Sequence, residues 1–130
     1  MTAAEIKHLE QWLEKANHDL IAARLIIDAS PIILDVACFH CQQAVEKYLK
    51  AFLVFKKLDF PKTHNLDLLL KSCADINPVF AVIDLFNMED FAVRGRYPHD
   101  FISPTTEETE HFYQIALAVK SIALKEIGTM

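Results

Sequence analysis

The sequence predicts an all-α fold in which several helices pack into one bundle. Hydrophobic residues make up 52% of the chain, and only 2 of its 130 residues are glycine, a composition typical of a compact helical protein. Apolar residues recur at helical spacing along most of the chain, and no segment shows the alternation expected of a strand. At this length we expect a single domain, residues 1–130, with a substantial hydrophobic core.

The first predicted helix follows Thr2 and ends at Ser30 and Pro31, because proline and the residue before it disfavour helical continuation. Thr2 and Glu5 have the spacing of a capping box. An unbroken heptad seam then runs along this helix through Ile6, Leu9, Leu13, Ala16, Leu20, Ala23 and Ile27. In a short chain with further helices, the seam favours antiparallel packing within a bundle over a coiled coil.

The chain is organised around residues 36–55, which contain neither glycine nor proline. They predict a helix from about residues 33–35 to Lys57, central in the domain because apolar residues occupy nearly its whole circumference. Its main apolar face holds Cys38, Cys41, Val45, Tyr48, Leu49 and Phe52. The other side holds Val36, Phe39 and Val54 beside a polar stripe formed by His40, Gln43, Lys47 and Lys50. Two interpretations of the stripe are open. Its side chains are either solvated or part of an interface, or they form a line of hydrogen-bond donors that faces an anion.

Cap and breaker residues divide the next part of the chain. After a loop at residues 58–63, Thr63 and Asn65 are both able to cap a short third helix. Asn77 and Pro78 are expected to end the third helix and to begin a new helical segment. The segment that follows is expected to be a fourth helix with an apolar stripe of Val79, Val82, Ile83 and Phe86.

Several residues indicate where the last predicted helix begins. Ser103 is expected to be its N-cap and Pro104 its first residue, followed by Glu107 and Glu108 in the first turn. Its apolar face holds Phe112, Ile115, Ala116, Val119, Ile122 and Ala123. Gly128 lies just past the predicted end, as glycine often does.

Charge and composition limit the classes of function. A formal net charge of −5 disfavours a broad nucleic-acid coat, although residues 47–62 hold a local excess of lysine. The N-terminus does not have the pattern of a secretory signal, and no apolar run is long enough to span a membrane. Three cysteines, an odd number, fit a reducing cytoplasm. We therefore expect a cytoplasmic protein without a membrane partner.

Two small motifs each allow a structural and a functional interpretation. Cys38 and Cys41 form a Cys-x-x-Cys pair, but both fall on the apolar face and no second pair completes a zinc site, so we expect core residues and no metal. His64 follows Lys62 at the start of the third helix. It either hydrogen-bonds the loop backbone or forms, with Lys62, a phosphate site at the helix N-terminus.

Residues 94–99 gather the most suggestive chemistry. Arg94 and Arg96 can bind phosphate bidentately, and His99 can transfer protons near neutral pH. With Tyr97 they could handle a phosphodiester without a metal. The alternative is a surface loop with two solvated arginines.

Three segments together carry a family resemblance. Residues 38–51, residues 61–66 and the Arg-Tyr-Pro of residues 96–98 resemble the HEPN domain (higher eukaryotes and prokaryotes nucleotide-binding). The likeness extends from about Trp12 to the last helix. It implies an up-and-down bundle of four to five helices, commonly a homodimer and often encoded beside a minimal nucleotidyltransferase. Many members are linked to nucleotide binding or to metal-free RNA cleavage in toxin–antitoxin and defence systems.

The ribonuclease motif of this family is an arginine, four to six residues and a histidine, which Arg94 and His99 match with four residues between them. One toxin branch continues His-x-Tyr, and the tyrosine can receive AMP from the partner enzyme. This chain has Phe101 in that place. Small members often carry Arg-Tyr-Pro without a catalytic histidine.

Three functional hypotheses remain at this point. The first is a module that binds nucleotide or RNA phosphate and works with a nucleotidyltransferase. Its binding residues would be His40, Gln43, Lys47, Lys50, Lys62, His64, Arg96 and Tyr97. The second is a metal-independent endoribonuclease that uses Arg94 and His99. The third is a non-catalytic helical dimerisation module. None of them requires a cofactor, although a nucleotide could be the ligand.

Overall fold

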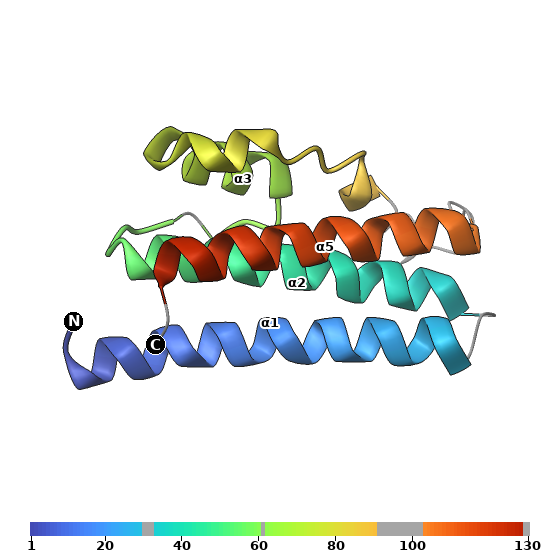
Figure 1. The fold of residues 1–130 in the computed structure, drawn as a ribbon, viewed down its shortest axis with the longest axis horizontal. Helices are drawn as coiled ribbons and strands as arrows, with labels where there is room; N and C mark the ends of the chain where they lie inside the picture. Colours follow the sequence, from blue (N-terminus) through green and yellow to red (C-terminus); the bar gives the residue numbers. More distant parts are fainter. Residues whose placement is uncertain (30–32, 61, 91–102, 129–130) are drawn as a thin grey trace.

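The computed structural model describes residues 1–29, 33–60, 62–90 and 103–128, and the secondary structure in these ranges is helical without strands. The helices are α1 (Ala3–Ala29), α2 (Leu34–Phe55), α3 (Leu66–Ile76), the 3-10 helix η2 (Pro78–Val82) and α5 (Thr106–Ile127) (Figure 1). The prediction of an all-α helical bundle is confirmed. None of the helices described is long and apolar enough to cross a lipid bilayer.

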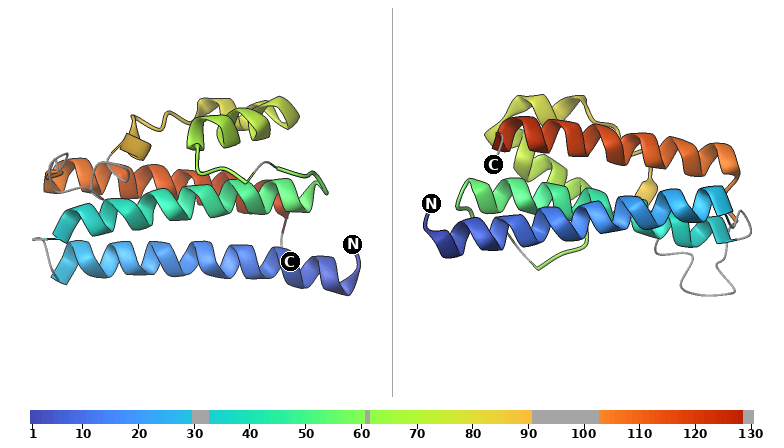
Figure 2. Two further views of the ribbon diagram at one scale, coloured as in Figure 1. Left: turned by 180° about the vertical axis from the view of Figure 1, so that it is seen from behind. Right: turned by 60° about the horizontal axis from the view of Figure 1, so that its bottom comes forward.

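Three long helices lie side by side, and α3 with η2 covers one side of them (Figures 1 and 2). Helices α2 and α5 run in the same direction, whereas α1 runs opposite to both. Helix α2 packs against α1, α5 and α3, which confirms its central place. Its whole predicted apolar face is buried, and Phe52 meets Phe80 of η2 with ring centroids 4.6 Å apart.

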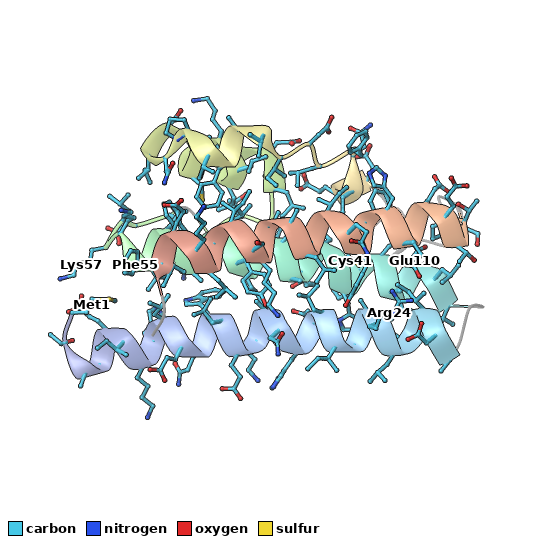
Figure 3. The ribbon with its side chains drawn as sticks, in the orientation of Figure 1. Met1, Arg24, Cys41, Phe55, Lys57 and Glu110 are labelled. Atoms are coloured by element: carbon cyan, nitrogen blue, oxygen red, sulfur yellow. The ribbon has the colours of Figure 1, made fainter. Side chains whose placement is uncertain are left out.

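Helix α1 follows its predicted pattern closely. Thr2 and Glu5 form the capping box, with backbone-to-side-chain distances of 3.0 and 3.1 Å. Five seam residues are buried, namely Leu9, Ala16, Leu20, Ala23 and Ile27. The flank facing α5 carries Arg24, whose guanidinium donates to Glu110 at 2.7 and 3.0 Å (Figure 3). These hydrogen bonds join α1 to the antiparallel α5.

Cys38 and Cys41 are core residues, as predicted, and Cys73 is a third. Cys38, Cys41 and Cys73 are all fully buried, and burial raises the pKa of Cys41 and Cys73 to about 12. A thiol with so high a pKa is a poor nucleophile near neutral pH. Across the described ranges, no group of three histidine, cysteine or acidic side chains could hold a metal ion.

The predicted fourth helix starts where it was expected but is shorter than its apolar stripe. It is a 3-10 helix confined to Pro78–Val82, and Val82 of the predicted apolar stripe is 75% exposed. The turn starts where the Asn77 side chain accepts the Val79 N–H at 3.1 Å. The 3-10 helix then ends because the backbone of Ile83 is extended, with φ −79° and ψ 128°.

The start of the last helix was misplaced by two residues. Thr105, not Ser103, is the N-cap, and its hydroxyl accepts the Glu108 N–H at 3.0 Å. The Glu108 carboxylate accepts the Thr105 N–H at 2.9 Å, which completes a capping box. A cap at Ser103 would place Thr106 at the third helical position, where no carboxylate returns the hydrogen bond. Gly128 follows the helix end with φ 87°, as predicted.

Candidate functional site

The polar stripe of α2 lies beside α1, where it meets a carboxylate. Asp19 of α1 is mostly buried, with its side chain 11% exposed. One carboxylate oxygen is 2.8 Å from Nδ1 of His40, and the other accepts from Nζ of Lys47 at 2.6 Å. Asp19 therefore holds an imidazole and an ammonium group of α2 in fixed positions along the α1–α2 boundary.

A second carboxylate repeats this arrangement one turn further along α2. Glu46 accepts from Nζ of Lys50 at 3.2 Å and lies 2.9 Å from Nδ1 of His64. The Glu46 and Lys50 side chains are only 4% and 8% exposed, whereas His64 is 74% exposed. The hydrogen-bond partner of Nδ1 of His64 is thus a carboxylate of α2 and not the loop backbone.

The other predicted binding residues lie apart from these two clusters or outside the described ranges. Gln43 donates to Gln42 at 3.0 Å and is half-buried. Lys62 is exposed, and it makes no hydrogen bond or ion pair among the residues described. Four predicted residues lie outside the described ranges, namely Arg94, Arg96, Tyr97 and His99. The structure therefore brings together His40, Lys47, Lys50 and His64 on the α2 side of the domain.

Two aromatic rings near Lys50 were not foreseen as part of this site. The Lys50 ammonium lies 5.7 Å from the centroid of Trp12 and 5.4 Å from that of Phe60. The two rings meet edge to face with centroids 6.0 Å apart. Trp12 belongs to α1 and Phe60 follows α2, so only the packing of these segments brings both rings to Lys50. A cation held over aromatic faces gains an electrostatic attraction.

An open groove lies between α1 and α2 next to these groups. It has a volume of about 210 Å³ and is lined by His8, Gln11, Trp12, Lys15 and Lys47. We call these five residues the α1–α2 groove. Lys15 makes no ion pair among the described residues, so its ammonium is available to a ligand. A larger hollow of about 360 Å³ adjoins the groove at His8, but Glu5 and Asp59 also line it, which makes it less suited to an anion.

Acidic side chains gather around Glu89. Burial raises the pKa of Glu89, and the nearby carboxylates of Asp67, Asp90 and Glu46 raise it further, against a hydrogen bond from the Leu66 backbone. Negative charge thus gathers around Glu89 and Glu46, while Lys15 and Lys47 line the groove beside Trp12. An anion would be attracted to this groove.

The site offers hydrogen-bond donors and oriented imidazoles. An ammonium group has three N–H donors, so Lys47 keeps two after its contact with Asp19. In His40 and His64 the Nδ1 atom faces a carboxylate, which leaves Nε2 for another partner. The arrangement can bind an anion, and its imidazoles can exchange protons with a bound group.

Comparisons with known proteins give one match. Residues 9–127 match the family model described as the HEPN domain, which covers nearly the whole chain. Curated proteins and solved structures give no match.

Proposed function

The chain belongs to the HEPN domain family, and from this we propose that it binds the phosphate groups of a nucleotide or of RNA. A role connected with nucleotides or RNA follows from the family. The observation that carries the finer proposal is the convergence of Lys15 and Lys47 on one groove in a chain of net charge −5. Cations concentrated in an otherwise acidic protein attract anions to that place.

The fixed position of Lys47 favours binding. Asp19 holds its ammonium at 2.6 Å, so little side-chain entropy remains to be lost when a phosphate arrives. Lys15 approaches from α1, and the two lysines can contact one phosphate from both sides of the groove. His40 is held by the same carboxylate, which leaves its Nε2 for another partner.

Titration with ATP, AMP and a short single-stranded RNA, at low and at moderate salt, tests this proposal. We expect saturable binding that weakens with salt, because phosphate binding releases counterions. Lys15→Ala should weaken the binding, and Lys47→Ala combined with Arg96→Ala should weaken it further. Lys71→Ala is the matched control, since Lys71 is an exposed lysine on α3. Absence of binding to every ligand, or equal binding by all variants, would contradict the proposal.

A metal-independent endoribonuclease is the second candidate function. It is supported by the family and by the Arg-x4-His spacing of Arg94 and His99. His99 would take the proton of the 2′-hydroxyl, Arg94 would stabilise the phosphorane, and Arg96 and Tyr97 would orient the RNA. Two protomers would combine these pairs across a symmetry axis.

A gel assay on single-stranded RNA with EDTA present tests the enzyme. Wild-type protein should cleave the RNA, whereas Arg94→Ala and His99→Ala should not. Cleavage that persists in His99→Ala, or no cleavage by the wild type, would remove the enzymatic function and leave a binding module.

We also propose a cytoplasmic homodimer that works with a nucleotidyltransferase, as part of a toxin–antitoxin or defence system. Apolar side chains support the homodimer, because Ile21, Leu25, Ile33 and Val36 are between 36% and 63% exposed. A dimerisation module without catalysis would have the same surface. Sedimentation equilibrium at micromolar concentration should give a dimer, and a clean monomer would contradict this part.

A further inference from the structure

We infer that the α1–α2 groove binds one nucleobase against Trp12 while Lys15 and Lys47 contact the attached phosphate. The ligand class is a nucleoside phosphate, either free or at a single-stranded position of RNA. The inference rests on the proposed phosphate binding and adds the recognition of the base. It is carried by the presence of an aromatic ring, two cations and an amide around one open groove.

The indole of Trp12 is held rigidly beside the groove. Its Nε1–H donates to Nε2 of His8 at 3.3 Å, and its ring meets the ring of Phe60 edge to face. The Lys50 ammonium lies 5.7 Å from its centroid. Because the single polar atom of the indole already has a partner and neighbouring groups fix the ring, a base can pack against it with little loss of entropy.

The groups around Trp12 match the parts of a nucleotide. Lys15 is three residues from Trp12 and therefore on the same side of α1, while Lys47 faces it from α2. Gln11 lines the same groove, and its amide can donate to and accept from the edge of a base. An apolar peptide would use the ring but would make no use of the ammonium groups of Lys15 and Lys47, so a base with a phosphate is the better fit.

The size of the groove limits what it can hold. Its volume of about 210 Å³ lies below the roughly 300–1,000 Å³ of usual ligand pockets. A whole nucleotide would not be enclosed. A single base can occupy the groove while its phosphate lies at the rim, where Lys15 is exposed.

Fluorescence makes this inference directly testable, because Trp12 is the only tryptophan of the chain. AMP should quench the emission of Trp12 saturably, whereas ribose 5-phosphate, which has no base, should bind without quenching. By calorimetry, Trp12→Leu should weaken AMP binding about tenfold, the usual scale for loss of one base–aromatic contact. The same variant should leave ribose 5-phosphate binding unchanged. Trp12→Phe keeps an aromatic ring and should retain most of the AMP affinity.

Two further arms complete the test. Lys15→Met should weaken AMP and ribose 5-phosphate equally, because it removes a phosphate contact. A short oligoadenylate compared with AMP identifies the source of the base, since the natural ligand should bind more tightly. Circular dichroism verifies that each variant is folded. If Trp12→Leu is unfolded, the quenching of wild type and the affinity of Trp12→Phe still decide the result.

The failures of the two proposals are distinguishable. Binding of AMP without quenching, or AMP affinity equal to that of ribose 5-phosphate, would overturn the base site and leave phosphate binding intact. If neither ligand binds and RNA does not bind either, both proposals fail.

Discussion

Replacing Lys50 by methionine tests whether the buried ion pair of α2 is as isolated from water as its geometry indicates. Lys50 and Glu46 are four residues apart on one helix, with 3.2 Å between Nζ and Oε2 and side chains 8% and 4% exposed. Methionine preserves an unbranched apolar chain between the rings of Trp12 and Phe60. The substitution therefore removes the positive charge and keeps most of the packing.

The expected loss of stability follows from the Glu46 carboxylate, which remains in the Lys50→Met variant. Removing one partner of a buried ion pair destabilises a protein by roughly 3–5 kcal/mol, because the other charge is left uncompensated. Here Glu46 keeps His64, whose Nδ1 is 2.9 Å away. We therefore expect the lower end of the range, about 3 kcal/mol. Adding Glu46→Leu removes the stranded charge, so the double variant should recover most of the loss.

Urea unfolding followed by circular dichroism at neutral pH measures these free energies by linear extrapolation. Lys71→Met is the matched control, because Lys71 also pairs with an acid four residues away, Asp75, but both side chains are at least 65% exposed. An exposed pair contributes at most about 1 kcal/mol. If Lys50→Met costs no more than Lys71→Met, or if the double variant is the least stable of all, the argument from burial is wrong.

Three further predictions concern other parts of the bundle. Thr105→Ala should destabilise the protein by about 1 kcal/mol, because it removes the cap of α5. The neighbouring Thr106→Ala should change the free energy of unfolding by less than about 0.5 kcal/mol. Equal effects of the two substitutions in urea unfolding would contradict the assigned cap. Arg24 lowers the pKa of Glu110, so Arg24→Gln should return it toward 4.5. In the wild type, this lowered pKa contributes stability that is present above pH 4.5 and lost as the pH falls through the lowered value. The variant should consequently lose less stability than the wild type between pH 7 and pH 3, which unfolding at the two pH values would measure. NMR titration would measure the pKa of Glu110, and an unchanged pKa in the variant would refute the contact. Cys41 should resist a thiol reagent in the native protein and react readily in urea, because burial raises its pKa to about 12; rapid native labelling would contradict its burial.

Local interactions account for what the sequence predicted correctly. The capping pair Thr2 and Glu5 and the Asn65 cap of α3 each join residues three apart, so the chain need not be folded to reveal them. The apolar periodicity of α1 and α2 likewise identified their buried faces. The predicted fourth helix is shorter than its apolar stripe because the backbone becomes extended at Ile83, which apolar spacing does not reveal.

Only the tertiary structure decided the environment of the polar stripe. The sequence placed His40 and Lys47 on one side of α2, but their shared partner Asp19 comes from α1, 21 and 28 residues away. Likewise, Trp12 became part of the groove only because α2 packs beside α1 and places Lys47 across from it. Helical periodicity determines which residues share a face, whereas the packing of one helix on another determines which charges and rings meet across it.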